Sequence, residues 1–343
     1  MVNRIFTTIF FYLWSLTALA NTMNPDISVI GTIGGGWTDS NSVQHEFDAS
    51  LSEVELGLKA DVDPYFTTEA YLTGNDGGFA VEEGHLDTLA LPWNFKGSLG
   101  KIRASFGKLN LTHEHVWSTV SPPLLATELF ENGALVDHGA RVAWLAPLST
   151  YHEVTVEALR GNDQVSFSGG ASGDWTGLAH LKNFFDLTDA TSLELGASAV
   201  QDANGAGPGT KTRIWGADLS LKWRPVESNV RNSISLQAEG AISERRQSDG
   251  SGGVETARMP GGWVLLDVQP WQRWHFAVRG DGAADPREPH AHSRAFSGVA
   301  GYSPSEFSNL MTEIRVDKSG GTSWTTVYLR VTYAIGPHGA HPF

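Results

Sequence analysis

The chain has 343 residues, a formal net charge of −14 and no cysteine. A disulfide framework and a thiolate metal site are therefore excluded, and the negative charge disfavours binding to a nucleic-acid backbone, so no nucleic-acid partner is expected. The 38 glycines, together with 12 Trp, 16 Phe and 7 Tyr, favour extended strands and tight turns over helices.

The N-terminus has the layout of a secretory signal peptide, which we assign to residues 1–20. An apolar run over residues 5–20 follows a basic residue and closes on Ala18 and Ala20. Small residues two positions apart mark a cleavage site, and an apolar run of about 16 residues is short for a spanning helix. We expect Sec-dependent export, cleavage after Ala20, and a single domain over residues 21–343.

Period-two alternation of apolar and polar residues recurs along the mature chain. In residues 52–62, Val54 and Leu56 fall on one face of an extended strand, whereas Glu53 and Glu55 fall on the other. The pattern recurs in residues 213–224, 309–317 and 324–335. None of these segments is a continuous apolar run, so buried parallel strands are disfavoured.

Sixteen segments are predicted to be strands, although residues 79–91 and 257–269 alternate poorly. They are residues 27–36, 50–62, 65–73, 79–91, 95–109, 138–146, 150–160, 174–186, 191–201, 210–224, 230–243, 257–269, 272–282, 295–302, 306–317 and 323–335. About 20 residues are available for each strand with its connection, and roughly 10 of them suffice to cross a membrane. Short connections such as residues 64–66 and 92–94 contrast with long ones such as 37–49. The sequence thus predicts an all-β fold, a transmembrane antiparallel β-barrel of about 16 strands (range 14–18) without a plug domain.

Two soluble folds would also alternate: a β-sandwich and a propeller. The apolar stripes here include many small residues, such as Ala197 and Ala199, where a soluble core would need bulk. No repeat of about 40 to 50 residues indicates a propeller. Together with the signal peptide, these observations favour a barrel in the bacterial outer membrane of a Gram-negative cell.

A secreted all-β hydrolase is an alternative function of another class. It would need two carboxylates across a cleft, and Glu53 with Glu55 or Glu153 with Glu157 are the candidate pairs. Carboxylates on one face of a strand are also expected in any wet lumen, and the chain has no G-x-S-x-G nucleophile elbow. We therefore expect no enzyme, no catalytic residue and no cofactor.

Several short motifs resemble a porin-like family of Gram-negative outer-membrane barrels. They are NPDISVI at 24–30, VELGLKADVDPY at 54–65, THEHVW at 112–117, LVDHGARVAWLAP at 135–147 and GPHGAH at 336–341. The family is distantly related to the phosphate-selective porins and is grouped with zinc-regulated outer-membrane proteins. The resemblance implies a barrel of this strand number whose long third outer loop folds into the lumen.

The polar face of the strands supplies the predicted pore lining. Its charged members are Glu53, Glu55, Lys59, Asp61, Glu69, Lys101, Arg103, Glu153, Glu157, Glu194, Asp218, Lys222, Arg224, Glu239, Arg273, Arg279, Glu313, Arg315 and Arg330. Acids and bases nearly balance, whereas pores select ions with rings of one charge sign. The prediction is a channel for diffusion of small hydrophilic solutes, without the phosphate selectivity of the relatives.

Residues 110–137 form the longest connection and are the candidate for the inward loop. His113, His115 and Trp117, with two prolines at 122 and 123, could stiffen a constriction there. A loop that packs on the outer rim is the alternative.

The chain has twelve histidines, which are candidate metal ligands. Three groups of them lie close in sequence, at 113–115, 290–292 and 338–341. His338 and His341 in the tail are the metal candidates, because two imidazoles can share one ion. This leaves open an alternative function in metal-linked, and specifically zinc-linked, outer-membrane uptake or reception.

The chain ends at Phe343, and a terminal aromatic residue resembles the signal read by the barrel assembly machinery, although Pro342 departs from the usual pattern. The expected partners are therefore this machinery, outer-membrane lipid and lipopolysaccharide, and small solutes. A homo-oligomer is compatible with the sequence.

Overall fold

The computed structural model describes residues 25–39, 47–75, 77–163, 165–168, 173–226, 232–248, 251, 253–284 and 292–336. The expected signal peptide, the tail residues His338 and His341, and Phe343 lie outside these described residues. The expectations for them remain predictions.

Sixteen strands make up the fold. They are β1 (Asp26–Asp39), β2 (Phe47–Asp63), β3 (Phe66–Asn75), β4 (Gly78–Thr88), β5 (Phe95–Arg103), β6 (Val136–Leu145), β7 (Tyr151–Leu159), β8 (Thr176–Thr188), β9 (Thr191–Ala203), β10 (Lys211–Trp223), β11 (Ser233–Ser248), β12 (Val254–Trp271), β13 (Trp274–Ala284), β14 (His292–Ser305), β15 (Ser308–Ser319) and β16 (Thr322–Ile335). Each of them overlaps one of the sixteen segments predicted from the sequence.

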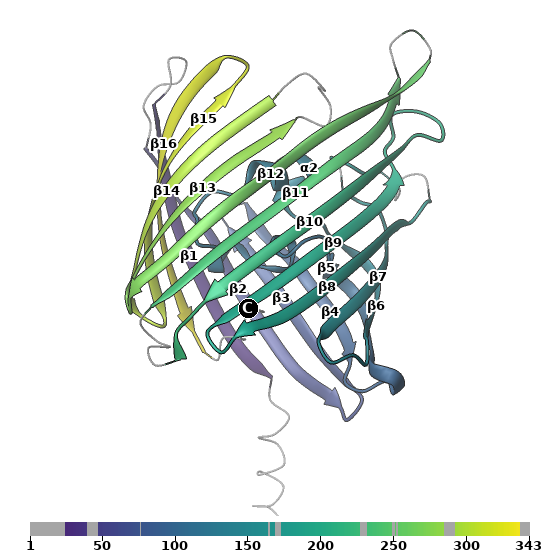
Figure 1. Ribbon diagram of the computed structural model, residues 1–343, viewed down its shortest axis with the longest axis horizontal. Coiled ribbons are helices and arrows are strands. Elements are labelled where there is room, and N and C mark those ends of the chain that lie inside the picture. Colours follow the sequence, from purple (N-terminus) through teal and green to yellow (C-terminus); the bar gives the residue numbers. More distant parts are fainter. Residues whose placement is uncertain are drawn as a thin grey trace, which may run out of the picture.

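The strands form one closed antiparallel barrel (Figure 1). Each strand pairs with its neighbours in sequence, and β1 closes the ring on β16, with Val29 opposite Ile335 and Asp39 opposite Thr325. Closure leaves no strand edge unpaired. The predicted 16-stranded antiparallel barrel is confirmed, and the described residues form no helical plug domain. Within the same described ranges, no helix is long and apolar enough to cross a membrane.

Large apolar side chains cover the outer face of the barrel. On β12, Val264 and Leu266 are 52% and 39% exposed, whereas Trp263 and Leu265 are 4% and 6% exposed. Because successive side chains of a strand point to opposite faces, the first pair faces outward and the second pair faces the lumen. Both faces of β12 are therefore apolar, which explains why residues 257–269 alternate poorly in the sequence.

The weak alternation of residues 79–91 has a different cause, a bulge in β4. The pairing of β4 with β3 shifts between Val81 and Glu83, which leaves Glu82 without a partner in the ladder. A bulge turns an extra side chain toward one face of the sheet. Consequently both Glu82 and Glu83 contact Arg103 inside the barrel.

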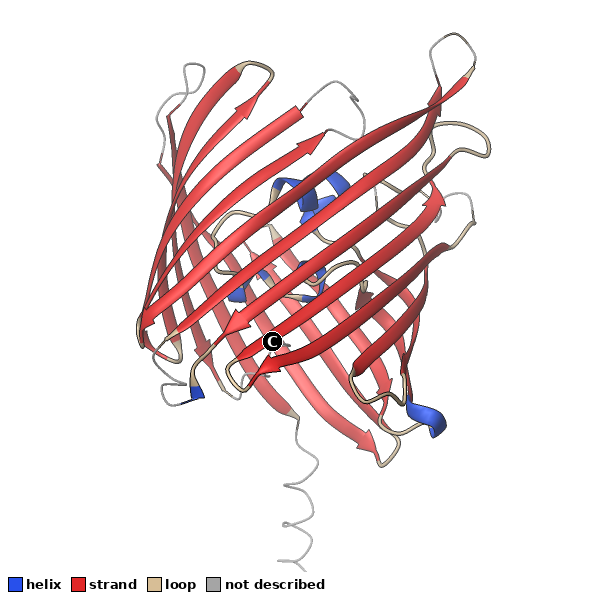
Figure 2. Ribbon diagram, viewed as in Figure 1, coloured by secondary structure: helices blue, strands red, loops and turns tan. Residues whose placement is uncertain are grey.

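Residues 104–135 join β5 to β6 and fold into the barrel, and we name them the inner segment. They contain η2 (Leu109–Leu111), η3 (Glu114–Val116), α2 (Leu124–Leu129) and η4 (Glu131–Gly133). Figure 2 shows these helical turns enclosed by the strands. The segment starts before the predicted loop, residues 110–137, because β5 ends at Arg103 and not at residue 109. The chain then turns at Gly107, whose φ of 67° is a left-handed conformation that glycine adopts without penalty.

Candidate functional site

The side chain of Asn110 joins the start of the inner segment to its end by hydrogen bonds. Its Nδ2 donates to the carbonyl oxygens of Ala104 at 2.7 Å and Leu135 at 3.0 Å. Its Oδ1 accepts the backbone N–H of Leu135 at 2.7 Å. The side chain is 7% exposed, so these bonds are shielded from water and close the segment where it leaves the barrel wall.

The first turn of the inner segment is anchored on β11 and β9. The backbone N–H groups of Lys108 and Leu109 both donate to Oε1 of Glu239, at 2.8 and 2.6 Å. The Lys108 ammonium lies 3.3 Å from a carboxylate oxygen of Glu194. The segment is therefore fixed to a wall of the barrel remote from its own strands.

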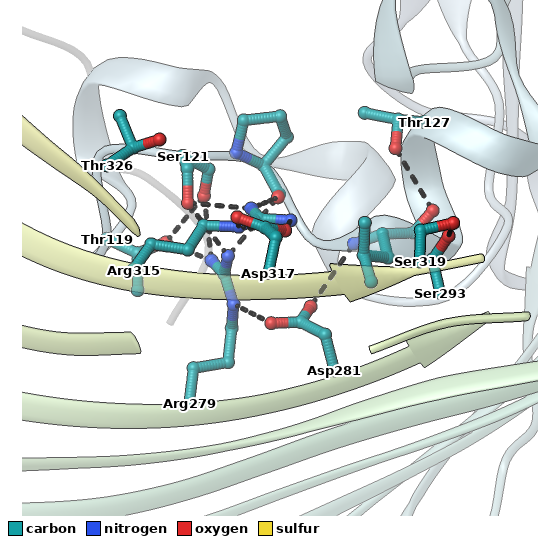
Figure 3. Close-up of polar contacts among 12 residues, drawn as sticks. Thr119, Ser121, Thr127, Arg279, Asp281, Ser293, Arg315, Asp317, Ser319 and Thr326 are labelled. Carbon is teal, nitrogen blue, oxygen red and sulfur yellow. Dashed lines mark hydrogen bonds and ion pairs between the residues drawn. The ribbon is translucent and has the colours of Figure 1, made fainter. Parts of the chain in front are cut away.

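A second anchor joins Ser121 to three charged residues of β13 and β15. Glu313 accepts the N–H groups of Val120 and Ser121 at 2.6 and 2.8 Å and the Ser121 hydroxyl at 2.6 Å. The guanidinium groups of Arg279 and Arg315 donate to the same hydroxyl oxygen at 3.0 and 2.9 Å. Figure 3 shows the two arginines converging on Ser121. Hydrogen bonds in both directions thus join the wall to the inner segment at Ser121.

Two aspartates orient these arginines. Arg279 Nε lies 2.8 Å from Asp281, and Arg315 Nη2 lies 2.9 Å from Asp317. Asp281 also accepts the N–H of Leu124 at the start of α2, at 3.2 Å. The carboxylates neutralise the buried guanidinium groups, which would otherwise be costly to enclose.

The remaining contacts of the inner segment are apolar. Leu125 and Leu129 of α2 are 6% and 4% exposed, and Phe106 and Phe130 meet edge to face at 5.4 Å between ring centroids. The wall contributes inward-facing apolar residues to the same cluster: Ile102, Leu159, Leu178, Val200, Ile214, Trp263 and Leu265. Part of the lumen is therefore a packed apolar core, whereas the sequence predicted a lumen lined by the polar face of the strands.

His113 lies between two carboxylates of the wall. Its Nδ1 is 2.9 Å from Glu55 Oε2 on β2, and its Nε2 is 3.0 Å from Glu83 Oε1 on β4. Burial lowers the pKa of His113, but the close contacts of its two ring nitrogens with the Glu55 and Glu83 carboxylates outweigh burial and raise the pKa to about 9. The imidazole therefore carries a proton near neutral pH and bridges β2 to β4.

His115 and Trp117 follow on the same stretch. His115 Nδ1 lies 3.7 Å from Glu55 Oε2, and the His115 side chain is 4% exposed. Trp117 is 8% exposed, and its indole N–H donates to the carbonyl of Thr112 at 3.1 Å. From β16, Arg330 donates to the carbonyls of Glu114 and Trp117 at 3.0 and 2.8 Å.

Two cavities flank this stretch of the inner segment. One, of about 490 Å³, lies near the short turns that follow β2 and β4 and is lined by Glu55 and His113. The other, of about 420 Å³, lies where β1 ends and β16 begins and is lined by Glu53 and His115. The histidines and Glu55 thus stand between two open volumes of the lumen.

Most of the charged residues predicted for the lumen lie on cavity walls or against the inner segment. Glu55, Lys59, Glu69, Arg103 and Glu153 line the first cavity, and Glu53 and Arg330 line the second. Glu157, Arg279, Glu313 and Arg315 contact the inner segment directly. Asp218 is buried on the inner face of β10, the face that Lys222 shares by alternation, and Asp61 is exposed at the end of β2.

Three residues of that prediction lie elsewhere. Lys101 pairs with His138, whose side chain is 68% exposed, and shares its strand face with Leu99, which is 65% exposed. Residues opposite each other on paired strands share a face, so Lys101 lies on the outer face. Arg224 is exposed just beyond the end of β10, and Arg273 is exposed in the turn between β12 and β13.

The inward carboxylates proposed for a hydrolase are engaged in structural contacts. Glu157 accepts the Nε–H of Arg141 at 2.6 Å and the N–H of Ser105 at 3.0 Å. Glu153 accepts the hydroxyl of Tyr151 at 2.8 Å. These contacts give no support to Glu153 and Glu157 as a catalytic pair.

Several residues that contact the inner segment or the wall arginines around it were not predicted from the sequence: Glu82, Glu83, Arg141, Asp281 and Asp317. Arg141 and Asp281 follow the alternation of their strands and could have been found by extending it along β6 and β13. Glu82 breaks the alternation at the bulge, so no periodic signal identifies it.

Solved structures with the same architecture cover almost the whole chain. An anion-selective porin from Comamonas acidovorans aligns with a TM-score of 0.62 over 91% of this chain and 100% of its own, at 11% sequence identity. The barrel has the porin fold. OmpF of Salmonella typhi, in complex with daunomycin, aligns at 0.61 over 92% and 99% of the two chains, at 11% identity. OprB of Pseudomonas putida aligns at 0.59 over 94% and 96%, at 9% identity.

Matches by sequence cover a smaller part of the chain than the matches by structure. No family model matches the chain. An uncharacterized protein of Aquifex aeolicus (strain VF5) is 37% identical over 134 residues, which is 39% of this chain and 28% of that protein. The chain therefore spans little more than a quarter of that relative. The grouping with phosphate-selective and zinc-regulated proteins stays a prediction.

Proposed function

We propose that the protein is a channel of the bacterial outer membrane through which small hydrophilic solutes diffuse. The observation that supports the proposal is the difference in polarity between the outer and inner faces of the barrel. The outer face is apolar, and the inner face bears charged groups around two cavities of about 490 and 420 Å³. A membrane barrel with a solute pathway needs this arrangement.

Exposed aromatic residues at the strand ends support the membrane location. They include Trp37, Tyr65, Trp93, Trp223, Trp271 and Trp274. Amphipathic aromatic rings gather at both interfaces of outer-membrane barrels. With the predicted signal peptide, this supports export to the outer membrane, where lipid, lipopolysaccharide and the assembly machinery would be the partners. The mature protein is expected to begin at Asn21, which mass spectrometry of the membrane fraction can check.

The mixed charge of the cavities supports a weakly selective pathway. Around the larger cavity, the acids Asp26, Glu55, Glu69, Glu83, Asp87 and Glu153 face the bases Lys59, Lys96, Arg103 and Arg141. Selectivity for one ion sign needs a ring of one charge. We therefore propose passage of small polar solutes without a strong preference for anions or cations.

Planar-bilayer recording with the purified full-length protein tests the proposal. Discrete current steps are expected, and shortening the inner segment is expected to raise the step size roughly twofold or more by widening the lumen. Residues 108–131 can be replaced by a short Gly-Ser linker, because Arg103 and Val136 pair directly at the two ends. Protein that stayed soluble without detergent, or that gave no steps in either form while migrating as a folded barrel, would refute the channel.

A further inference from the structure

Glu55, His113 and His115 bring three metal-ligating atoms together in the middle of the lumen. Glu55 Oε2 lies 2.9 Å from His113 Nδ1 and 3.7 Å from His115 Nδ1. The three side chains are 2%, 11% and 4% exposed. One carboxylate oxygen thus stands within reach of two imidazole nitrogens in a place largely shielded from solvent.

These distances suit a tetrahedral metal ion. Zinc binds histidine nitrogen and carboxylate oxygen at about 2.0 to 2.2 Å, which places the ligand atoms of a tetrahedral site about 3.3 to 3.5 Å apart. The observed 2.9 and 3.7 Å bracket that value, and all three atoms lie within 4.8 Å of one another.

Glu55 Oε2 gives an independent indication of a missing ligand. The atom is buried and accepts no hydrogen bond of good geometry, although His113 lies at ion-pair distance. Buried carboxylate oxygens normally have such a partner, and an orphaned one calls for an explanation. A cation bonded to this oxygen and to the two imidazoles would supply the partner.

The charge around the cluster also favours a cation. Glu53 and Glu82 belong to an overlapping group with Glu55, and Glu83 and Glu114 lie close by. Arg103 and Arg330 are the guanidinium groups that face this stretch, and Arg103 is engaged with Glu82 and Glu83. Five carboxyl groups face two guanidinium groups and the His113 imidazolium, which leaves a negative excess that a divalent ion would reduce.

The position of the cluster allows an ion to enter. Glu55 and His113 line one cavity, and His115 lines the other, so the site can be reached from both. Three protein ligands leave one position of a tetrahedral ion open to water or an exchanging ligand. Two imidazoles with one carboxylate suit zinc and its neighbours, whereas calcium and magnesium prefer all-oxygen sites.

We propose that Glu55, His113 and His115 form a binding site for a divalent transition-metal ion between the two cavities of the lumen. Binding depends on these three side chains and not on conduction, so the site goes beyond the channel function. It also differs from the tail site predicted at His338 and His341.

The test is metal binding by the full-length protein in detergent, with Co²⁺ absorption to report coordination and Zn²⁺ calorimetry to report affinity. The wild type is expected to bind one Co²⁺ ion with the intense visible bands of a tetrahedral complex. Glu55→Gln and His115→Ala are expected to weaken binding about 10-fold or more. Heat-modifiable migration on gels verifies that each variant is folded, and His115→Gln serves if the alanine variant does not fold.

Two control variants locate the ion. His138→Ala removes an exposed histidine of the outer face, and a double alanine variant of His338 and His341 removes the tail pair; both are expected to bind as the wild type does. Binding lost only in the tail variant would place the ion there and overturn the proposal. Wild-type affinity in both Glu55→Gln and His115→Ala, or displacement of Co²⁺ by equimolar Mg²⁺, would overturn it as well.

Bilayer recording separates this inference from the channel proposal. Zn²⁺ added to the chamber is expected to reduce the wild-type current and to leave the His115→Ala current unchanged. Co²⁺ binding without any current steps would refute the channel and keep the metal site. Current steps without Co²⁺ binding would refute the metal site and support the channel.

Discussion

Replacing Glu313 by alanine tests whether a single buried carboxylate fixes the inner segment to the wall. Glu313 is 0% exposed and accepts three hydrogen bonds, from the N–H groups of Val120 and Ser121 and from the Ser121 hydroxyl, at 2.6 to 2.8 Å. The variant leaves these donors unsatisfied and removes the negative charge next to two arginines.

The expected loss follows from the burial of these partners. A hydrogen bond to a charged group contributes about 1.5 to 3 kcal/mol, but three bonds that share one acceptor do not add. Removing one partner of a buried charged group costs about 3 to 5 kcal/mol. We expect Glu313→Ala to lower the free energy of unfolding by about 3 to 5 kcal/mol.

Urea unfolding in detergent micelles, followed by tryptophan fluorescence, measures this loss. Glu153→Ala is the matched control, because Glu153 also lines the lumen but accepts a hydrogen bond from Tyr151, an exposed residue of its own strand. The control is expected to stay within about 1 kcal/mol of the wild type. Equal stability of Glu313→Ala and Glu153→Ala, with unchanged bilayer conductance, would refute the role of Glu313 as an anchor.

Two further variants test the barrel wall and the turn into the lumen. Val264→Arg places a charge on the outer face of β12 and is expected to lower the free energy of unfolding by about 2 to 4 kcal/mol. Ser220→Arg, on the inner face of β10, is expected to lower it by less. Equal losses in the two variants would contradict the assignment of the outer and inner faces. Gly107→Ala is expected to cost about 1 to 2 kcal/mol, because its left-handed φ of 67° strains an alanine and a Cβ would lie 3.0 Å from the Glu239 carboxylate. A Gly107→Ala variant as stable as the wild type would show that the turn relaxes freely.

The amino-acid sequence determined the strands and their two faces. Alternation along the strand is local: it needs only that successive side chains point to opposite sides, so residues such as Val54 and Glu55 could be assigned without knowing their neighbours. Where both faces are apolar, as on β12, or where a bulge inserts Glu82, that local signal weakens. The strands were still found, because turns and connection lengths marked their ends.

The tertiary structure alone decided what the inward side chains contact. Ser121 and Glu313 are 192 positions apart, and His113 meets Glu55 and Glu83 from two different strands. Such contacts depend on the path of the inner segment through the lumen, which no periodicity encodes. Alternation therefore places a carboxylate inside the barrel, but the fold determines whether it lines a cavity, anchors a backbone or holds an ion.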